Sequence, residues 1–229
     1  MKCLPFLLLF LLLTGCSTVQ GPTTADAVSA SFALEEVLKL SSQSVDANLF
    51  ATTPLPSLLP PEASEFSMMV QIPLFLDHLT VWQEQVRTAF RQVVVAIPSL
   101  VETNAPLIIW DDPDQIILQG NRSATDTFIR QQGEALDAVV RKLLFEALQQ
   151  SEITWALILD RYDIWRKGTA LWGREELKPV NVQPFAHLHA LFVSQYLAQL
   201  GLLEEQLRTT PVPKGSGSFL EVFQKEARL

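Results

Sequence analysis

The sequence predicts an all-α protein whose single domain is made of several helices. Apolar residues recur at helical spacing along most of the chain, no hairpin signal or sustained period-two alternation interrupts them, and no internal repeat is visible. The composition suits a sizeable core, because 48% of the 229 residues are hydrophobic and 13 Phe and 5 Trp are among them. We expect this helical domain to span residues 25–229.

The N-terminal part of the domain is predicted to be a helix, a loop and a longer helix. Apolar residues between Ala25 and Leu49 fall largely on one helical face, which predicts a single helix. Proline fixes φ and lacks an amide donor, so the four prolines of residues 52–64 predict an extended surface loop, followed by a short extended piece at residues 69–74. Pro98 should stop or kink the long helix. That helix has the apolar stripe Leu76, Leu79, Trp82, Val86, Ala89, Val93 and Ile97.

Turn signals separate the elements in the middle of the chain. Residues 99–110 predict a second apolar helical piece, interrupted by Pro106. The Asp-Asp-Pro run at residues 111–113 is typical of a helix start, here of a short helix to Gln119. Gly120 then stands where the end of a helix favours a left-handed residue.

Several helices are predicted after this turn. Ser123 or Asn121 can cap a helix from Ala124, Gly133 marks a break, and another helix starts at Ser151. The helix from Ser151 has Trp155, Ile158, Tyr162 and Trp165 on one face and Ile153, Leu157 and Ile164 beside it. Such a wide apolar surface predicts burial on two sides and a central position.

The C-terminal part is predicted to contain two more helices. A connector at residues 168–184 precedes a long helix, and a link at residues 209–218, rich in Pro, Gly and Ser, precedes a short amphipathic helix that starts at Phe219. The long helix has the stripe Leu188, Phe192, Tyr196, Leu200, Leu203 and Leu207.

The first sixteen residues have the pattern of a secretion signal. Lys2 precedes an apolar run at residues 4–13, which is too short to span a bilayer and lacks the amphipathic pattern of a buried helix. The run ends in Leu13, Thr14, Gly15 and Cys16, which resembles the bacterial lipobox. This resemblance implies a lipoprotein signal peptide at residues 1–15, and a lipid on Cys16 that includes acyl chains such as palmitate.

The mature protein is then expected to be held at a bacterial membrane by its lipid alone. Residues 16–24 are small and polar and predict a flexible tether, and no mature segment reaches the roughly eighteen apolar residues of a spanning helix. Ser17 replaces the aspartate that commonly retains lipoproteins at the inner membrane. We therefore expect attachment to the outer membrane, facing the periplasm.

Charge and cysteine count argue against a nucleic-acid-binding protein and against a disulfide-stabilised fold. Formal net charge is −8, and loss of Lys2 with the signal leaves sixteen basic against twenty-five acidic residues. No stretch has more than two adjacent basic residues, so nucleic acid is not an expected partner. Cys3 leaves with the signal and Cys16 receives the lipid, so no disulfide is expected.

Residues 117–130, ILQGNRSATDTFIR, resemble the central signature of a bacterial lipoprotein family known as domain of unknown function 4197 (DUF4197), in which an I-L-x-G turn leads into A-T-x-x-F-R. Residues 33–49, VQIPL at 70–74 and parts of 191–223 are similar to further segments of that family. His189 replaces a family aspartate, and the Asn-Val-Gln run at 181–183 replaces Tyr-Val-Thr. The resemblance implies an α-helical envelope protein and assigns no catalytic residue.

The titratable residues offer no pattern of a catalytic or metal site. His187 and His189 are two residues apart, so on a helix they point about 200° apart and cannot share a metal. We expect them at a partly exposed helix start. The aspartates of residues 111–114 lack the alternating ligands and the late glutamate of a calcium loop, which favours helix capping. We predict no metal, no cofactor and no enzymatic activity.

Two i, i+4 pairs, Asp163 with Lys167 and Glu204 with Arg208, are interpreted as ion pairs on solvated helix faces. The residues 120–123 resemble an anion cradle at a helix start only through one glycine, and a turn that connects core helices is the favoured interpretation.

An aromatic set formed by Trp155, Tyr162, Trp165 and Trp172 is either core, which we favour, or the lining of an apolar groove. Two hypotheses for function remain. The first is a lipid-anchored, non-enzymatic interaction or scaffold protein with an envelope protein as partner, and the alternative is a binder of an apolar small molecule or lipid in a helical groove.

Overall fold

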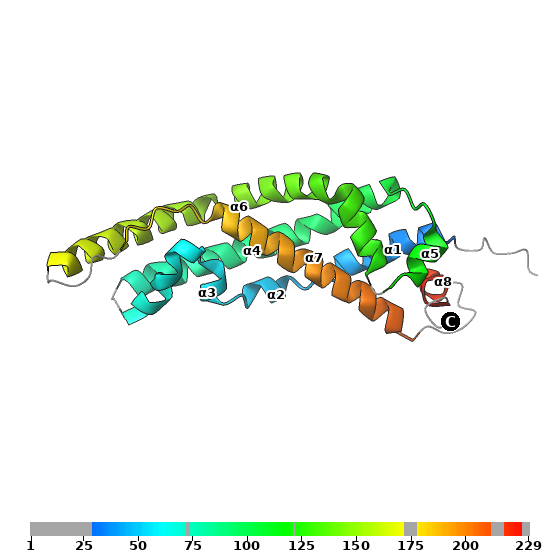
Figure 1. The fold of residues 1–229 in the computed structure, drawn as a ribbon, viewed down its shortest axis with the longest axis horizontal. Coiled ribbons are helices and arrows are strands. Elements are labelled where there is room, and N and C mark those ends of the chain that lie inside the picture. Colours follow the sequence, from blue (N-terminus) through cyan, green and yellow to red (C-terminus); the bar gives the residue numbers. More distant parts are fainter. Residues whose placement is uncertain (1–28, 72–73, 121, 172–177, 212–217, 226–229) are drawn as a thin grey trace, which may run out of the picture.

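The computed structural model describes residues 29–71, 74–120, 122–171, 178–211 and 218–225, which are mostly helical (Figure 1). No strand occurs within these ranges, so the all-α prediction is confirmed. The predicted signal peptide and tether lie outside the described residues. Among the helices of the described ranges, none combines the length and hydropathy needed to cross a membrane.

Two long helices form the spine of the molecule. Helix α4 (Phe75–Asn104) runs along it, and α6 (Ser123–Leu171) returns beside α4 in the opposite direction (Figure 1). Helix α7 (Phe185–Thr209) packs against α6 and ends near the start of α6. The other elements are α1 (Ala30–Gln43), α2 (Ala47–Ala51), α3 (Leu55–Leu58), the 3₁₀ segments η1 (Pro61–Gln71) and η2 (Ala105–Leu107), α5 (Pro113–Leu118) and α8 (Phe219–Lys225).

The single helix predicted between Ala25 and Leu49 is wrong. Helix α1 ends at Gln43, and α2 starts after Asp46, whose carboxylate accepts a hydrogen bond of 2.8 Å from the amide of Asn48. Aspartate side chains compete with the backbone for amide donors, and this capping bond separates the two helices.

The extended structure predicted for residues 52–64 and 69–74 is also wrong where it is described. Pro54 is the N-cap of α3, and Pro61 is the first residue of η1, which continues to Gln71. Proline suits these positions because the first amides of a helix have no partner within the helix. Leu58 and Leu59 are buried and hold the segment against the core.

The breaks predicted at Gly133 and Ser151 do not occur, and Pro98 does not stop its helix. Helix α4 continues through Pro98 to Asn104, and α6 continues through Gly133 and Ser151 over 49 residues, about 73 Å at 1.5 Å per residue. A helical glycine costs only about 1 kcal/mol, and contact with α4 along much of α6 outweighs it. Ser151 donates its hydroxyl to the Leu148 carbonyl at 2.7 Å, so it lies within the helix rather than at its start.

The turn before α6 and the last two helices are confirmed. Asp112 caps α5 by accepting a hydrogen bond of 3.0 Å from the Gln115 amide, and Gly120 has a φ of +139°, which non-glycine residues rarely adopt. Helix α7 buries Leu188, Phe192, Tyr196 and Leu200, and α8 buries Phe223.

Aromatic rings join the helices in the core. The Trp82 ring of α4 lies 4.9 Å from the Trp155 ring of α6, and Phe66 of η1 lies 4.9 Å from the Tyr162 ring. Phe192 of α7 contacts the Phe50 and Phe90 rings, which brings α2, α4 and α7 together. These contacts fix the register between α4 and α6.

Candidate functional site

The aromatic residues proposed as a groove lie mostly in the core. Trp155 and Tyr162 are buried, and Trp165 is half-buried against the core, whereas Trp172 lies outside the described residues. The Trp155 indole donates a hydrogen bond of 2.8 Å to the Val182 carbonyl, and the Tyr162 hydroxyl donates one of 2.9 Å to the Lys178 carbonyl. Trp155 and Tyr162 therefore hold residues 178–184 against α6.

The second apolar face of α6 is not buried, which corrects the prediction of burial on two sides. Ile153 is 68% exposed, Leu157 is 46% exposed and Ile164 is 56% exposed. The other elements pack on the face that includes Trp155, Ile158 and Tyr162. A row of large apolar side chains is thus left in solvent on the longest helix of the described chain.

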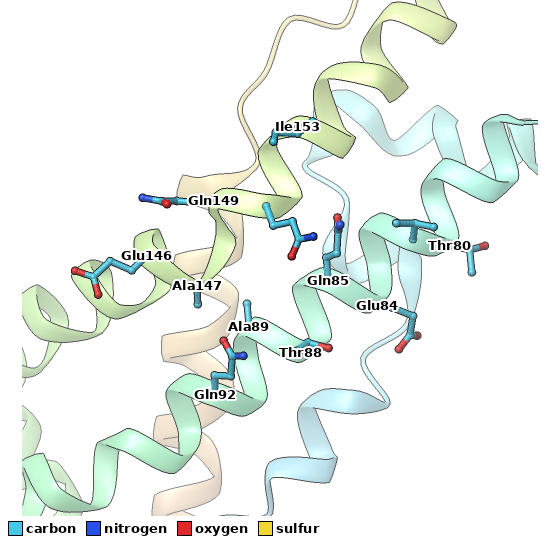
Figure 2. Close-up of a pocket in the computed structure, with 12 residues that line it drawn as sticks. Thr80, Glu84, Gln85, Thr88, Ala89, Gln92, Glu146, Ala147, Gln149 and Ile153 are labelled. Carbon is cyan, nitrogen blue, oxygen red and sulfur yellow. The ribbon is translucent and has the colours of Figure 1, made fainter.

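A groove of about 870 Å³ lies between α4 and α6 next to this row. Figure 2 shows Gln85 and Gln92 on α4 and Ala147 on α6 at the gap, with Glu146 and Gln149 pointing outward from α6. The groove is lined by Thr80, Val81, Glu84, Gln85, Thr88, Ala89 and Gln92 of α4 and by Glu146, Ala147, Gln149, Gln150 and Ile153 of α6.

The lining of this groove, which we call the amide groove, is suited to recognition rather than to catalysis. Its four glutamines offer both donors and acceptors, and the buried Oε1 of Gln85 has no hydrogen-bond partner. The small residues Ala89 and Ala147 leave room between the two helices. Histidine, cysteine and aromatic residues do not line it. The sequence did not predict this groove, although Gln85 and Gln92 lie seven residues apart on one helical face.

The start of α6 is the second polar feature of the fold. The first amides of this helix bind a carboxylate of the same chain rather than an external anion. The Glu204 carboxylate of α7 accepts hydrogen bonds of 3.1 Å and 2.8 Å from the amides of Ala124 and Thr125. A carboxylate in this place satisfies first-turn amides and interacts favourably with the helix dipole. The turn at Gly120 therefore connects core helices.

The prediction that Glu204 and Arg208 form a solvated pair is wrong, because both are buried. Arg208 donates to Glu204 at 2.9 Å, to the Ile117 carbonyl at 2.7 Å and to the Ser123 hydroxyl at 2.8 Å. Its guanidinium also lies 4.2 Å from the centre of the Phe223 ring. Arg208 thus joins the last carbonyls of α5, the start of α6, and α8.

The remaining titratable candidates have structural roles. His187 contacts the Ser57 carbonyl at 2.9 Å near the start of α7, as expected for a partly exposed helix start, but His189 is buried with Asp137 at 3.2 Å. The exposed Lys167 pairs with Asp163 at 2.5 Å, and this hydrogen bond lowers the pKa of Asp163. Within the described ranges, no group of three or more His, Cys, Asp or Glu side chains could hold a metal ion.

Comparison with known proteins adds no relative. Neither protein-family models, nor curated proteins, nor solved structures match this chain. The resemblance to domain of unknown function 4197 therefore stays a prediction.

Proposed function

We propose that this protein is a lipid-anchored lipoprotein of the bacterial cell envelope and acts as a non-enzymatic interaction protein. The proposed attachment point is Cys16, which follows the apolar run and ends the Leu-Thr-Gly-Cys sequence. The proposed location is the periplasmic face of the outer membrane. We also propose membership of the family domain of unknown function 4197.

The observation that carries the interaction role is the amide groove together with the exposed row Ile153, Leu157 and Ile164. Contiguous exposed apolar side chains rimmed by polar ones are typical of protein interaction sites. Helix α1, the first described element, begins at the end of the molecule where α5 and α8 lie, whereas α6 extends to the opposite end (Figure 1). A lipid attached before α1 would leave the exposed row free to face a partner.

The groove chemistry favours a protein partner over the alternative ligand, an apolar small molecule or lipid. Such a ligand needs a concave, mostly apolar site that buries most of its surface. The amide groove is open to solvent and could not bury most of such a ligand, and eight of its twelve lining residues are polar. Trp155 and Tyr162, which could have lined an apolar site, are buried in the core.

Lipid attachment is tested by Cys16→Ser. We expect metabolic labelling with a palmitate analogue to mark the natural protein and not the variant, and sucrose-gradient fractionation to place the labelled protein with the outer membrane. Labelling of the variant would refute the lipidation site, and labelled protein in the inner-membrane fraction would refute the proposed outer-membrane location.

The interaction role is tested by a photocrosslinking amino acid at Ile153 in the full-length, membrane-attached protein. We expect adducts with an envelope protein at Ile153. The same amino acid at Leu202, an exposed position on α7 outside the groove, should give none. If neither position gives an adduct in cells, the interaction role is wrong.

A further inference from the structure

The exposed side chains around the amide groove follow the spacing of a helix-docking seam. Ile153, Leu157 and Ile164 lie at i, i+4 and i+11 on α6. On α4, the row Val81, Gln85, Thr88, Gln92 and Val95 alternates steps of four and three residues. Such spacing keeps side chains on one face of a helix and forms the holes into which side chains of a neighbouring helix fit.

The charges around this seam are distributed unequally between its ends. Trp82 and Trp155 lie level, with ring centres 4.9 Å apart, and α4 and α6 run in opposite directions (Figure 1). Asp77 and Asp160 are each five residues from these tryptophans, toward the same end, so they lie level with each other. Both are exposed.

Acidic side chains continue into the groove, whose lining includes Glu84 and Glu146 and no lysine or arginine. Glu84 is paired with Arg87 at 2.7 Å. Basic residues outside the lining, Arg91 and the exposed Lys142, lie toward the opposite end from Asp77 and Asp160. Within the described ranges neither Asp77 nor Asp160 forms an ion pair, and the exposed Arg161 next to Asp160 does not share its face, because neighbouring helix positions do not face each other. The end of the seam at Asp77 and Asp160 is therefore negatively charged.

We infer that the amide groove binds an amphipathic α-helix of another protein, with basic side chains at the end that lies over Asp77 and Asp160. This inference rests on the proposed interaction role and names the chemistry of the partner. A helix satisfies its own backbone hydrogen bonds, so it can offer apolar side chains to Val81, Ile153 and Leu157 while its polar side chains meet the glutamines. Lysine or arginine at one end would pair with the two aspartates and set the direction of the helix.

A second copy of this chain is the weaker choice of occupant. It would bring the same excess of acidic residues, twenty-five against sixteen basic ones once the signal is removed, so long-range repulsion opposes association of two copies and favours a basic helix.

The decisive experiment identifies the segment that is attached to the photocrosslinker at Ile153. Adducts from the full-length protein in its own envelope are digested and sequenced by mass spectrometry, and cells that express isotope-labelled and unlabelled copies reveal adducts between two copies. We expect one segment of another protein, with apolar residues at i, i+3 or i+4 and i+7 and with Lys or Arg at one end.

Other adducts at Ile153 would overturn the inference in distinguishable ways. The partner chemistry would be refuted by an adduct with an acidic or non-helical segment, with a second copy of this chain or with a lipid. None of these adducts would refute the proposed lipid attachment at Cys16. Absence of any adduct would refute the inference and the interaction role together.

A synthetic peptide with the sequence of the attached segment then tests the charge argument. Its affinity for the full-length protein should fall about threefold to tenfold in the double variant Asp77→Asn and Asp160→Asn. The matched control is Glu102→Gln with Glu134→Gln, because these exposed residues lie on the same two helices beyond the other end of the groove and change net charge equally. Equal affinity for both double variants would refute the role of Asp77 and Asp160.

Discussion

The two halves of α6 differ in which side chains are buried: a charged pair is buried at its start, and apolar side chains are exposed in its second half. At its start, α6 receives the carboxylate of Glu204, which is 0% exposed and paired with Arg208. In its second half, Ile153 is 68% exposed although its neighbour Trp155 is fully buried. A charged pair is thus inside the protein while a row of isoleucine and leucine is outside it.

Unpaired backbone groups explain the first half of α6. The last carbonyls of α5 and the first amides of α6 meet α7 in the interior, and such groups must find partners there. Glu204 accepts from the amides, and Arg208 donates to the carbonyl of Ile117, so the burial of each charge serves a helix end. The exposed row of the second half lies inside α6, where backbone groups pair within the helix, so no charged partner is needed there and the outer face is free for a partner.

The largest expected effect is on the buried pair. Glu204→Ala leaves Arg208 buried without its counter-charge and two α6 amides unpaired, so we expect about 3–5 kcal/mol lower free energy of unfolding by chemical denaturation. Adding Arg208→Met should recover part of this loss. As a control, Asp163→Ala breaks an exposed pair and should leave the melting temperature almost unchanged. A small effect of Glu204→Ala would remove the contrast between the two halves.

A similar loss is expected from the buried face of the second half. Trp155→Ala creates a cavity and removes the hydrogen bond to the Val182 carbonyl, so we expect about 3–5 kcal/mol of destabilisation. Trp165 is only half-buried, and Trp165→Ala should cost about 1–2 kcal/mol. Urea denaturation of both variants checks this order, which equal losses would contradict.

The next effect concerns alkaline pH. Burial raises the pKa of Tyr196 to about 12, although its hydrogen bond of 2.7 Å with the Ser42 hydroxyl acts in the opposite direction. Burial, and to a smaller extent the negative charge of Glu65, also raises the pKa of Tyr162. Unfolded tyrosine titrates near 10, so the stabilisation is fully present below about pH 10 and is lost as pH rises toward 12, by about 2–3 kcal/mol for Tyr196.

Denaturation at several pH values measures this loss, and Tyr196→Phe supplies the control because phenylalanine does not titrate. The variant should lose less stability between pH 10 and 12 than the natural protein. An identical slope in both proteins would show that Tyr196 does not cause the alkaline sensitivity.

The smallest expected effect on stability is on the exposed face. Ile153→Gln removes an apolar side chain from solvent and should change the free energy of unfolding by less than about 0.5 kcal/mol, as should Leu202→Gln on α7. In cells, Ile153→Gln should nevertheless reduce capture of the envelope partner, whereas Leu202→Gln should not. A large loss of stability in Ile153→Gln would mean that this face is part of the core.

The sequence reading succeeded where a local chemical rule acts alone. Asp112 capped its helix as predicted, and Gly120 adopted the expected positive φ. Prediction failed where a local signal competes with tertiary contacts, because Gly133, Ser151 and Pro98 each favour a helix end that contacts between α4 and α6 prevent. For the candidate site, the sequence offered only the aromatic set Trp155, Tyr162, Trp165 and Trp172, of which Trp155 and Tyr162 are core and none lines the amide groove. The glutamines of that groove have no pattern that distinguishes a groove from a solvated helix face.

The sequence by itself determined that the described protein is all-α, where the turn at Gly120 lies and most of the two stripes of α4 and α7 that face the core, because helical periodicity and turn chemistry depend on neighbours within a few residues. The exception is Leu76 of the predicted α4 stripe, which is 42% exposed. Only the tertiary structure decided that Glu204 and Arg208 are buried and that Ile153, Leu157 and Ile164 are exposed. The physical reason is that burial depends on which distant element packs against a helix face. Helix α7 packs against the start of α6, whereas the outer face of the second half of α6 is uncovered within the described chain.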